Sequence, residues 1–258
     1  MDNDDKPIGR VLTRREALAL LAMAGAGALA ACTPGATATS TSAATATTAV
    51  VEVPTQTVAS GTAVTPTCVV RPEVTEGPYY VDEGLIRADI RSDTATGAVK
   101  AGTPLTLRFV VAQVTDAGCA ALPDATVEVW HCDADGVYSD VTDRSFDTTG
   151  QDFLRGALMT DANGVATFTT IYPGWYSGRT VHIHFKVRPN ANQVLTSQIF
   201  FDDALSDGVF EAEPYASKGQ RDTLNSNDGI YEDALLVAAT QTADGGYEAV
   251  FQIGVDLT

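Results

Sequence analysis

From residue 103 onward, apolar residues recur at every second position in short segments that are separated by turn residues. The segments that fit strands are 105–112, 125–131, 165–171, 181–187, 194–201, 234–240 and 247–255. Asn163-Gly164 is a strong tight-turn signal, and Asp-Gly-Gly at 244–246 joins the last two segments as a hairpin. Helical periodicity is weak, with room for a turn or two only within 212–235. This pattern predicts an all-β fold, an antiparallel β-sandwich with little helix.

A change in composition marks where this folded domain begins. Residues 33–67 are almost wholly Thr, Ala, Ser, Val and Pro, and Glu52 is their only charged residue. Such a stretch has no large side chains from which to build a core. We therefore expect residues 32–67 to form a flexible tether and residues 68–258 to form one folded domain.

The first 31 residues carry a targeting pattern. Arg14-Arg15 stands directly before the apolar run 17–31, which has the length of a signal-peptide core and is too short to span a bilayer well. This arrangement resembles a twin-arginine (Tat) export signal. The run ends at Cys32, which resembles the lipid-carrying cysteine of a bacterial lipobox; the alternative is an ordinary cleaved signal. Residues 1–31 thus predict a Tat-type lipoprotein signal peptide and an exported, extracellular or cell-surface bacterial lipoprotein, anchored to the membrane only through Cys32.

The charge balance excludes one class of partner. The chain has 33 Asp and Glu against 16 Lys and Arg, which gives a formal charge of −17. Nucleic-acid binders use Lys and Arg to displace counterions from phosphates, so no nucleic-acid partner is expected. The acidic excess fits a solvated exterior.

Three further cysteines, Cys68, Cys119 and Cys132, lie in the folded domain. An exported domain is expected to contain a disulfide, and the odd number leaves one thiol over. Cys119 and Cys132 lie near opposite ends of one predicted strand, which holds them apart. Cys68 is therefore expected to pair with one of them, with Cys132 favoured; the alternative is three small buried residues.

Two of the three histidines stand at alternating positions in a strand pattern. His182 and His184 lie on one face of the predicted strand, and Ile183 lies on the other. Two imidazoles on one side of a strand form a natural edge for a metal ion, although either ring can also be hydrogen-bonded in a core. Tyr176 and Arg179 come just before this strand, and Tyr138 follows another strand closely.

The chemistry of these side chains discriminates among metals. Non-haem Fe(II) oxygenases use two His and a carboxylate, and structural zinc prefers Cys. Two tyrosines with two histidines suit a hard trivalent ion, which would hold the phenols as phenolates. An Fe(III) site with two phenolates and a hydroxide is neutral, and it stays neutral when a catecholate dianion replaces one phenolate and the hydroxide. A copper or zinc site on His182 and His184 remains an alternative.

Four segments resemble the signature segments of the intradiol ring-cleavage dioxygenases, the family of catechol 1,2- and protocatechuate 3,4-dioxygenases, most closely its short extracellular branch. They are TEGPYY at 75–80, VWHCDADGVY at 129–138, TIYPGWY at 170–176 and RTVHIHF at 179–185. The resemblance implies a β-sandwich fold and non-haem Fe(III) as cofactor. It also implies a small catecholic substrate that is cleaved with O2 to a cis,cis-muconate-type product.

The resemblance also assigns roles by position. It implies Tyr138 and His184 as equatorial iron ligands and Tyr176 and His182 as axial ones, with Tyr176 leaving when the catechol binds. Arg179 matches the family arginine beside the metal, where a cation stabilises developing negative charge. Gln198 matches a glutamine on the side where oxygen reacts.

The chain departs from the family pattern in two ways. It lacks a long helical N-terminal segment of the kind that catechol 1,2-dioxygenases use to dimerise, which leaves its oligomeric state open. Trp175 stands where a smaller residue is common, so the preferred catechol is also open. Tyr79 and Tyr80 either line the entrance to the site or pack at the start of the domain.

A function of another class competes with catalysis. Residues 122–168 share the pattern of transthyretin-like and carboxypeptidase-regulatory-like sandwich modules, many of which do not catalyse reactions. That alternative explains the strands but not the set of Tyr138, Tyr176, His182 and His184. His131 matches no ligand position and is expected to be structural. Residues 133–136 are expected to form a tight turn, since they lack the later acid of a calcium loop.

Overall fold

The computed structural model describes residues 65–257. The predicted signal peptide, Cys32 and nearly all of the predicted tether lie outside the described residues. Within residues 65–257, no helix is long and apolar enough to cross a membrane.

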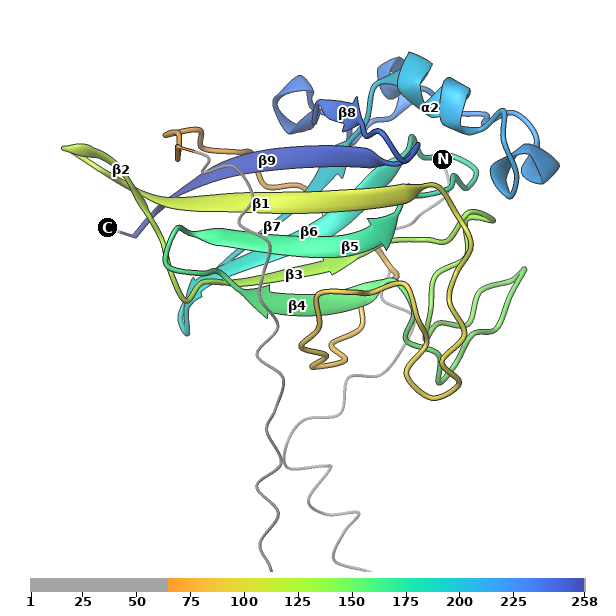
Figure 1. Cartoon of the computed structure of the whole chain (residues 1–258), viewed down its shortest axis with the longest axis horizontal. Coiled ribbons are helices and arrows are strands. Elements are labelled where there is room, and N and C mark those ends of the chain that lie inside the picture. Colours follow the sequence, from red (N-terminus) through yellow and green to blue (C-terminus); the bar gives the residue numbers. More distant parts are fainter. Residues whose placement is uncertain (1–64, 258) are drawn as a thin grey trace, which may run out of the picture. The chain divides into compact units, whose positions relative to one another are not determined.

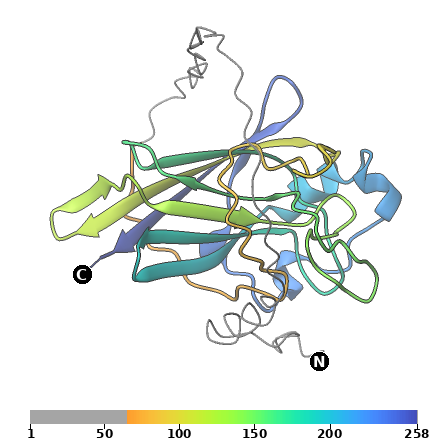
Figure 2. The same cartoon turned by 90° about the horizontal axis from the view of Figure 1, so that it is seen from below.

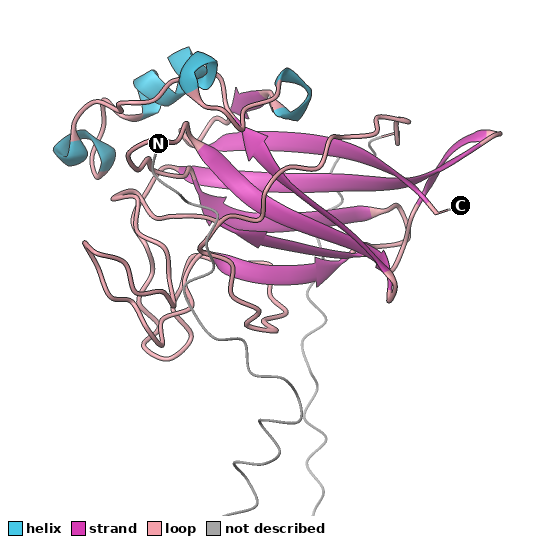
Figure 3. Ribbon diagram, turned by 180° about the vertical axis from the view of Figure 1, so that it is seen from behind, coloured by secondary structure: helices cyan, strands magenta, loops and turns pink. Residues whose placement is uncertain are grey.

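Two β-sheets form the framework of the domain (Figures 1 and 3). The first sheet has the order β2-β1-β9-β8, with β5 also paired to β1, and the second has the order β4-β3-β6-β7. The first comprises β1 (Pro104–Thr115), β2 (Gly118–Ala121), β5 (Val165–Ile171), β8 (Ala239–Gln241) and β9 (Tyr247–Asp256). The second comprises β3 (Thr126–Trp130), β4 (Arg155–Met159), β6 (His182–Asn190) and β7 (Gln193–Phe200). The predicted β-sandwich is confirmed.

Alternation along the strands creates the core between the two sheets. Phe109 of β1 and Phe251 of β9 project from the first sheet, and Phe185 of β6 projects from the second. The Phe185 ring centroid lies 5.3 Å from that of Phe109 and 5.5 Å from that of Phe251. Every strand pair is antiparallel except β1 with β9, which run parallel. Side-chain alternation gives the buried face of a strand but not the direction of its neighbour, so this pair was not predicted.

The loops that carry polar residues gather at one end of the sandwich. Figures 1 and 2 show residues 139–153 and the helical segment 203–235 at the end opposite the β1–β2 turn. That segment contains α2 (Asp203–Val209) and three short 3-10 helices, η1 (Tyr215–Lys218), η2 (Asn225–Asn227) and η3 (Asp233–Leu235). Helix α2 begins before the range predicted for helical turns, because Asp202 caps it by accepting a hydrogen bond from the Leu205 N–H.

The disulfide joins Cys68 to Cys119, with 5.4 Å between their Cα atoms, so the preference for Cys132 was wrong. Cys119 lies on β2 in the first sheet, whereas Cys132 follows β3 in the second. The chain next to Cys68 runs beside β9 of the first sheet, since the Gly254 N–H donates to the Val69 carbonyl over 2.7 Å. Cys132 is a buried free thiol, and burial raises its pKa to about 12.

Removing this disulfide is expected to destabilise the domain. The crosslink spans 51 residues and restricts the unfolded chain. Without this restriction the free energy of unfolding is expected to fall by about 4 kcal/mol. Chemical denaturation of the Cys68→Ser/Cys119→Ser double variant measures the change in the free energy of unfolding. Cys132→Ala is the matched control, because it removes a cysteine and keeps the crosslink. A double variant as stable as the parent protein would contradict the expectation.

Candidate active site

Four side chains converge at the end of the second sheet where the loops gather. The His182 Nε2 atom lies 3.4 Å from the Tyr138 hydroxyl, 3.2 Å from the Tyr176 hydroxyl and 3.1 Å from His184 Nε2. These are the four residues that the sequence predicted as metal ligands, and the structure brings all of them together.

The strand pattern of β6 sets the direction of the two imidazoles. Ile183 and Phe185 enter the core, so His182 and His184 point to the opposite face of the sheet. Both rings are nevertheless buried, since loops cover that face. The His184 ring is stacked on Trp130 of the neighbouring strand β3, with centroids 5.0 Å apart and an interplanar angle of 8°.

The two tyrosines come from loops that follow strands. Tyr138 follows β3 after a tight turn in which the Asp133 carboxylate accepts hydrogen bonds from the Asp135 and Val137 N–H groups. This confirms the turn predicted at 133–136. Tyr176 lies between β5 and β6, and its loop passes so close to the turn that a Cβ on Gly174 would lie 2.4 Å from the Asp133 carbonyl oxygen.

The hydrogen-bonding capacity of His182 fits a cation at the centre of the four groups. His182 Nδ1 donates to the Thr180 carbonyl over 2.6 Å, which leaves one lone pair on Nε2. One lone pair cannot satisfy three neighbours within 3.4 Å. His184 Nδ1 is buried and finds no hydrogen-bond partner among residues 65–257. A cation bound by all four donors would take up the Nε2 lone pair of His182 and, with the proton on Nδ1, that of His184.

The pKa shifts of the four groups also favour a bound cation. Burial raises the pKa of the Tyr138 and Tyr176 phenols well above the usual value. Burial also lowers the pKa of His182 to about 3 and that of His184 well below its usual value. Near neutral pH the four groups alone are therefore uncharged, and only a strong cation would hold the phenols as phenolates.

The donor set also limits which residues can serve as ligands. In the described part of the chain, no group of three or more His, Cys, Asp or Glu side chains is placed to hold a metal ion. At the cluster around His182 Nε2, the available side-chain donors are two phenols and two imidazoles. Tyrosinate and imidazole together suit Fe(III), because the ion is hard and trivalent.

Arg179 and Gln198, the two further residues to which the resemblance assigned roles, contact each other. An Arg179 Nη2 donates to Gln198 Oε1 over 2.6 Å, and Gln198 Nε2 donates to the Thr75 carbonyl over 2.9 Å. Gln198 is opposite His184 in the β6–β7 register. Burial is the main cause of the pKa shifts of Tyr176 and His182, and the charge of Arg179 also acts on both groups. The guanidinium therefore lies within electrostatic reach of the candidate metal ligands.

The segment 75–80 forms an aromatic wall of the site. Tyr79 is stacked on Tyr138, with centroids 4.6 Å apart, and is edge-on to Tyr176 at 5.9 Å. Tyr80 instead packs on Trp130 at 4.9 Å. The sequence left open whether these tyrosines line the site or pack at the start of the domain. Tyr79 lies beside the site, and Tyr80 packs against Trp130.

Two further buried residues near the site are His131, which the sequence predicted as structural, and Asp228, which it did not single out. His131 is structural, as predicted: its Nδ1 donates to the Cys132 carbonyl over 2.8 Å, and its Nε2 lies 2.7 Å from the Thr170 hydroxyl. Asp228 was missed, although it pairs with Arg179 Nε at 2.9 Å. It lies 49 residues from Arg179, and no local motif connects them.

Gly77 offers a test of the space beside His184. Its φ is +75°, and a Cβ there would lie 3.0 Å from His184 Cε1. Gly77→Ala is expected to lower metal affinity by about tenfold or more, because small displacements of ligands have effects of that size. Isothermal titration with Fe measures this.

Gly97→Ala is the matched control for Gly77→Ala. Gly97 has a φ of +72° with nothing within 4 Å of the added Cβ. Both variants carry about 1–2 kcal/mol of left-handed backbone strain. Equal metal affinity in the two variants would show that contact with His184 is unimportant.

Known dioxygenases are similar to this chain in sequence. A family model described as Dioxygenase matches residues 75–248. The chain is 34% identical over 154 residues to the protocatechuate 3,4-dioxygenase beta chain of Burkholderia cepacia, a match that covers 55% of this chain and 65% of that protein. It is 29% identical over 145 residues to a chlorocatechol 1,2-dioxygenase of Pseudomonas putida, covering 49% and 52%. The chain therefore spans about half to two thirds of these relatives' lengths.

Solved structures agree with this similarity. An intradiol ring-cleavage dioxygenase from Tetranychus urticae superposes with a TM-score of 0.64 and 30% identity, covering 73% of this chain and 95% of that one. The dioxygenase domain of a carbohydrate-binding fusion protein from Streptomyces sp. SirexAA-E gives a TM-score of 0.54 and 28% identity, covering 73% and 99%.

Proposed function

The chain belongs to the intradiol ring-cleavage dioxygenase family, and from this premise we propose that it is a non-haem Fe(III) dioxygenase. Its substrates are catecholic aromatics, which it cleaves with O2 between the two hydroxylated carbons to cis,cis-muconate-type products. The observation that carries the proposal is the convergence of two phenols and two imidazoles, with three donor atoms within 3.4 Å of His182 Nε2.

The proposed cofactor is held by Tyr138, Tyr176, His182 and His184. When bound, Fe(III) supplies a Lewis acid that favours the dianionic form of the catechol and accepts electron density from it. The role of the protein is to keep the donors in place and to exclude carboxylates that would change the charge of the site.

The two tyrosines differ in their freedom to move. The Tyr138 side chain is 1% exposed and lies under Tyr79, which suits a permanent ligand. Tyr176 is only partly buried and is followed by the exposed residues Ser177 and Gly178. We assign to Tyr176 the exchangeable position, where its Oη receives a proton from a catechol hydroxyl.

Arg179 and Gln198 act on the substrate ring. Deprotonation of a catechol places negative charge on the ring, and the buried Arg179 guanidinium is positioned to stabilise it. Gln198 holds one end of that guanidinium through its side-chain oxygen. The ring of Tyr79 forms an aromatic wall against which a planar substrate can pack.

The competing functions explain less of the molecule. A non-catalytic sandwich module gives no reason to gather two phenols and two imidazoles, three of these side chains buried, at one place. A copper or zinc site on His182 and His184 would leave the convergence of the two phenols unexplained.

Oxygen uptake with catechol, protocatechuate and hydroxyquinol, followed by the mass of the product, tests the proposal. We expect consumption of one O2 per ring cleaved and a product whose mass equals that of the substrate plus O2. No uptake by iron-loaded protein with any of the three, or a product that contains one added oxygen atom, would overturn the proposal.

The proposal extends to the location of the protein. The pattern of Arg14-Arg15, the apolar run 17–31 and Cys32 supports Tat-type export followed by lipid anchoring. The disulfide between Cys68 and Cys119 is consistent with an oxidising compartment. Mass spectrometry of the mature protein distinguishes a lipid-modified Cys32 from an ordinary cleaved signal, in which Cys32 carries no lipid.

A further inference from the structure

The guanidinium of Arg179 is held by two partners. Its Nη2 donates to Gln198 Oε1 over 2.6 Å, and its Nε donates to Asp228 Oδ2 over 2.9 Å. Gln198 comes from β7 beside the candidate ligands, whereas Asp228 comes from the distant segment that follows α2. Two contacts made through different nitrogens of a planar group fix both its position and its orientation.

The Asp228 carboxylate is itself fixed on both oxygens. Its Oδ2 also accepts a hydrogen bond from the Thr180 N–H over 2.8 Å, and its Oδ1 accepts one from the Ile230 N–H over 2.8 Å. The side chain is 1% exposed. Burial alone would raise the pKa of Asp228, but the charge of Arg179 and these N–H groups outweigh it and hold the pKa below its usual value. The carboxylate is therefore a rigid anion rather than a mobile surface group.

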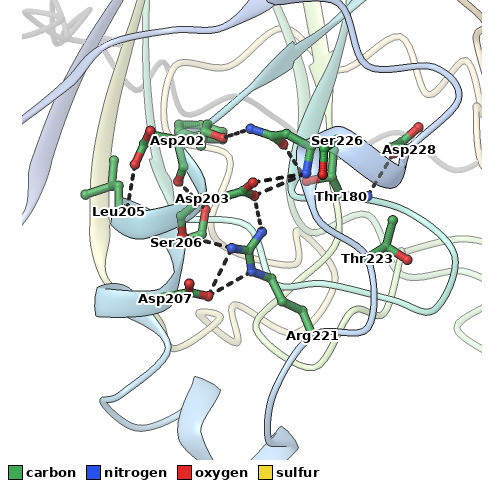
Figure 4. Close-up of polar contacts among 12 residues, drawn as sticks. Thr180, Asp202, Asp203, Leu205, Ser206, Asp207, Arg221, Thr223, Ser226 and Asp228 are labelled. Atoms are coloured by element: carbon green, nitrogen blue, oxygen red, sulfur yellow. Dashed lines mark hydrogen bonds and ion pairs between the residues drawn. The ribbon is translucent and has the colours of Figure 1, made fainter.

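The segment that carries Asp228 is anchored to helix α2, as Figure 4 shows. Arg221 bridges Asp203 and Asp207 of the helix, at 2.6 and 3.0 Å. The Asn225 N–H donates to the Asp203 carboxylate over 3.2 Å, and the Asn225 side chain accepts a hydrogen bond from the Thr180 hydroxyl over 2.6 Å. The same segment thus contacts both α2 and the residue that follows Arg179, which leaves Asp228 little freedom to move.

We propose that Asp228 is a positioning residue that fixes the guanidinium of Arg179 toward the substrate ring. The inference rests on the proposed function, in which Arg179 stabilises charge on that ring. Asp228 makes no hydrogen bond to the four candidate ligands, although its charge acts on Tyr176 and His182 in the direction opposite to that of Arg179. The effect proposed here is the one that passes through the position of Arg179. A buried ion pair with only a structural role would change stability and leave the kinetics of folded enzyme unaltered.

A double-mutant cycle separates these two roles. Asp228→Asn keeps the shape of the side chain and removes its charge, and we expect kcat to fall by about 100-fold, as for a catalytic group displaced by about 1 Å. KM and the iron content are expected to change little. In the Arg179→Gln background, Asp228→Asn is expected to have no further effect on kcat. An unchanged kcat in the single variant, or the same loss in both backgrounds, would overturn the proposal.

Asp93→Asn is the matched control for loss of a buried carboxylate. Asp93 is 5% exposed and accepts hydrogen bonds from the N–H groups of Thr96 and Asp152, remote from Arg179 in these contacts. The Asp93→Asn variant is expected to have a lower melting temperature and an unchanged kcat. Because Asp228→Asn leaves a buried cation without its partner, that variant can fail to fold. The double variant with Arg179→Gln removes both charges, and a kcat there well below that of Arg179→Gln alone would also contradict the proposal.

A crystal structure of Asp228→Asn supplies a readout that does not depend on turnover. We expect the Arg179 guanidinium to move away from Gln198 Oε1, and a guanidinium that keeps this contact in its original place would refute the positioning role. If wild-type protein consumes no O2 with any catechol, the proposed function fails, while the crystal structure still decides whether Asp228 positions Arg179.

Discussion

His184→Ala is expected to yield protein without its metal and without turnover. The imidazole lies 3.1 Å from His182 Nε2 in the group of four donors, and no carboxylate among the described residues is placed to replace it. Since loss of residues that merely orient a ligand lowers metal affinity by about 10–100-fold, loss of a ligand is expected to lower it by more than about 100-fold. Tyr138→Phe is expected to act in the same way, because the hydroxyl oxygen that it removes is the donor atom of this residue.

Iron content, the visible spectrum and oxygen uptake measure the effect of these substitutions. His131→Gln is the matched control, since His131 is equally buried but hydrogen-bonds to the Cys132 carbonyl and the Thr170 hydroxyl instead of the four donors. This control is expected to lose stability and retain iron. Full iron content and turnover in His184→Ala or Tyr138→Phe would show that the substituted residue is not a metal ligand.

Arg179→Gln is expected to lower kcat by about 10²–10³-fold, the usual effect of removing one preorganised group that stabilises transition-state charge. Iron content is expected to stay the same, because Arg179 is not among the four donors. Asp228 keeps two backbone N–H donors, from Thr180 and Ile230, so its carboxylate is not left without partners.

Arg179→Lys separates charge from geometry. Lysine keeps the positive charge but has no rigid planar group with separate nitrogens to hold Gln198 and Asp228 at once. Its kcat is therefore expected to lie between those of the parent and Arg179→Gln, as measured by steady-state oxygen uptake. A kcat in Arg179→Gln close to that of the parent would show that the charge of Arg179 has no part in the reaction.

The strands with alternating apolar residues were predictable because burial of one face enforces that pattern. β5 was predicted with its observed bounds, residues 165–171, and β9 was predicted to within one residue. β4 (Arg155–Met159) was missed: its burial does not alternate, since Arg155 is buried by hydrogen bonds to the Ser139 side chain and the Tyr79 carbonyl. The predicted strand 234–240 was wrong in its first part: it overlaps the last two residues of η3 (Asp233–Leu235) and only the first two of β8 (Ala239–Gln241).

The candidate site was predictable to the extent that its residues lie in local motifs. His182 and His184 are two positions apart on one strand, and Tyr176 and Arg179 precede them closely. The Cys68–Cys119 pairing and the contact of Asp228 with Arg179 depend on how distant segments pack. Neither has a local signal, because the pairing of sheets and the path of residues 203–235 are determined only in the folded chain.

The iron content and visible spectrum of the purified protein test the central assignment most directly. We expect about one Fe(III) per chain and a red-brown colour from phenolate-to-iron charge transfer, both lost in Tyr138→Phe. Protein that stays colourless after incubation with iron, or that binds one copper or zinc ion per chain in preference to iron, would contradict the assignment.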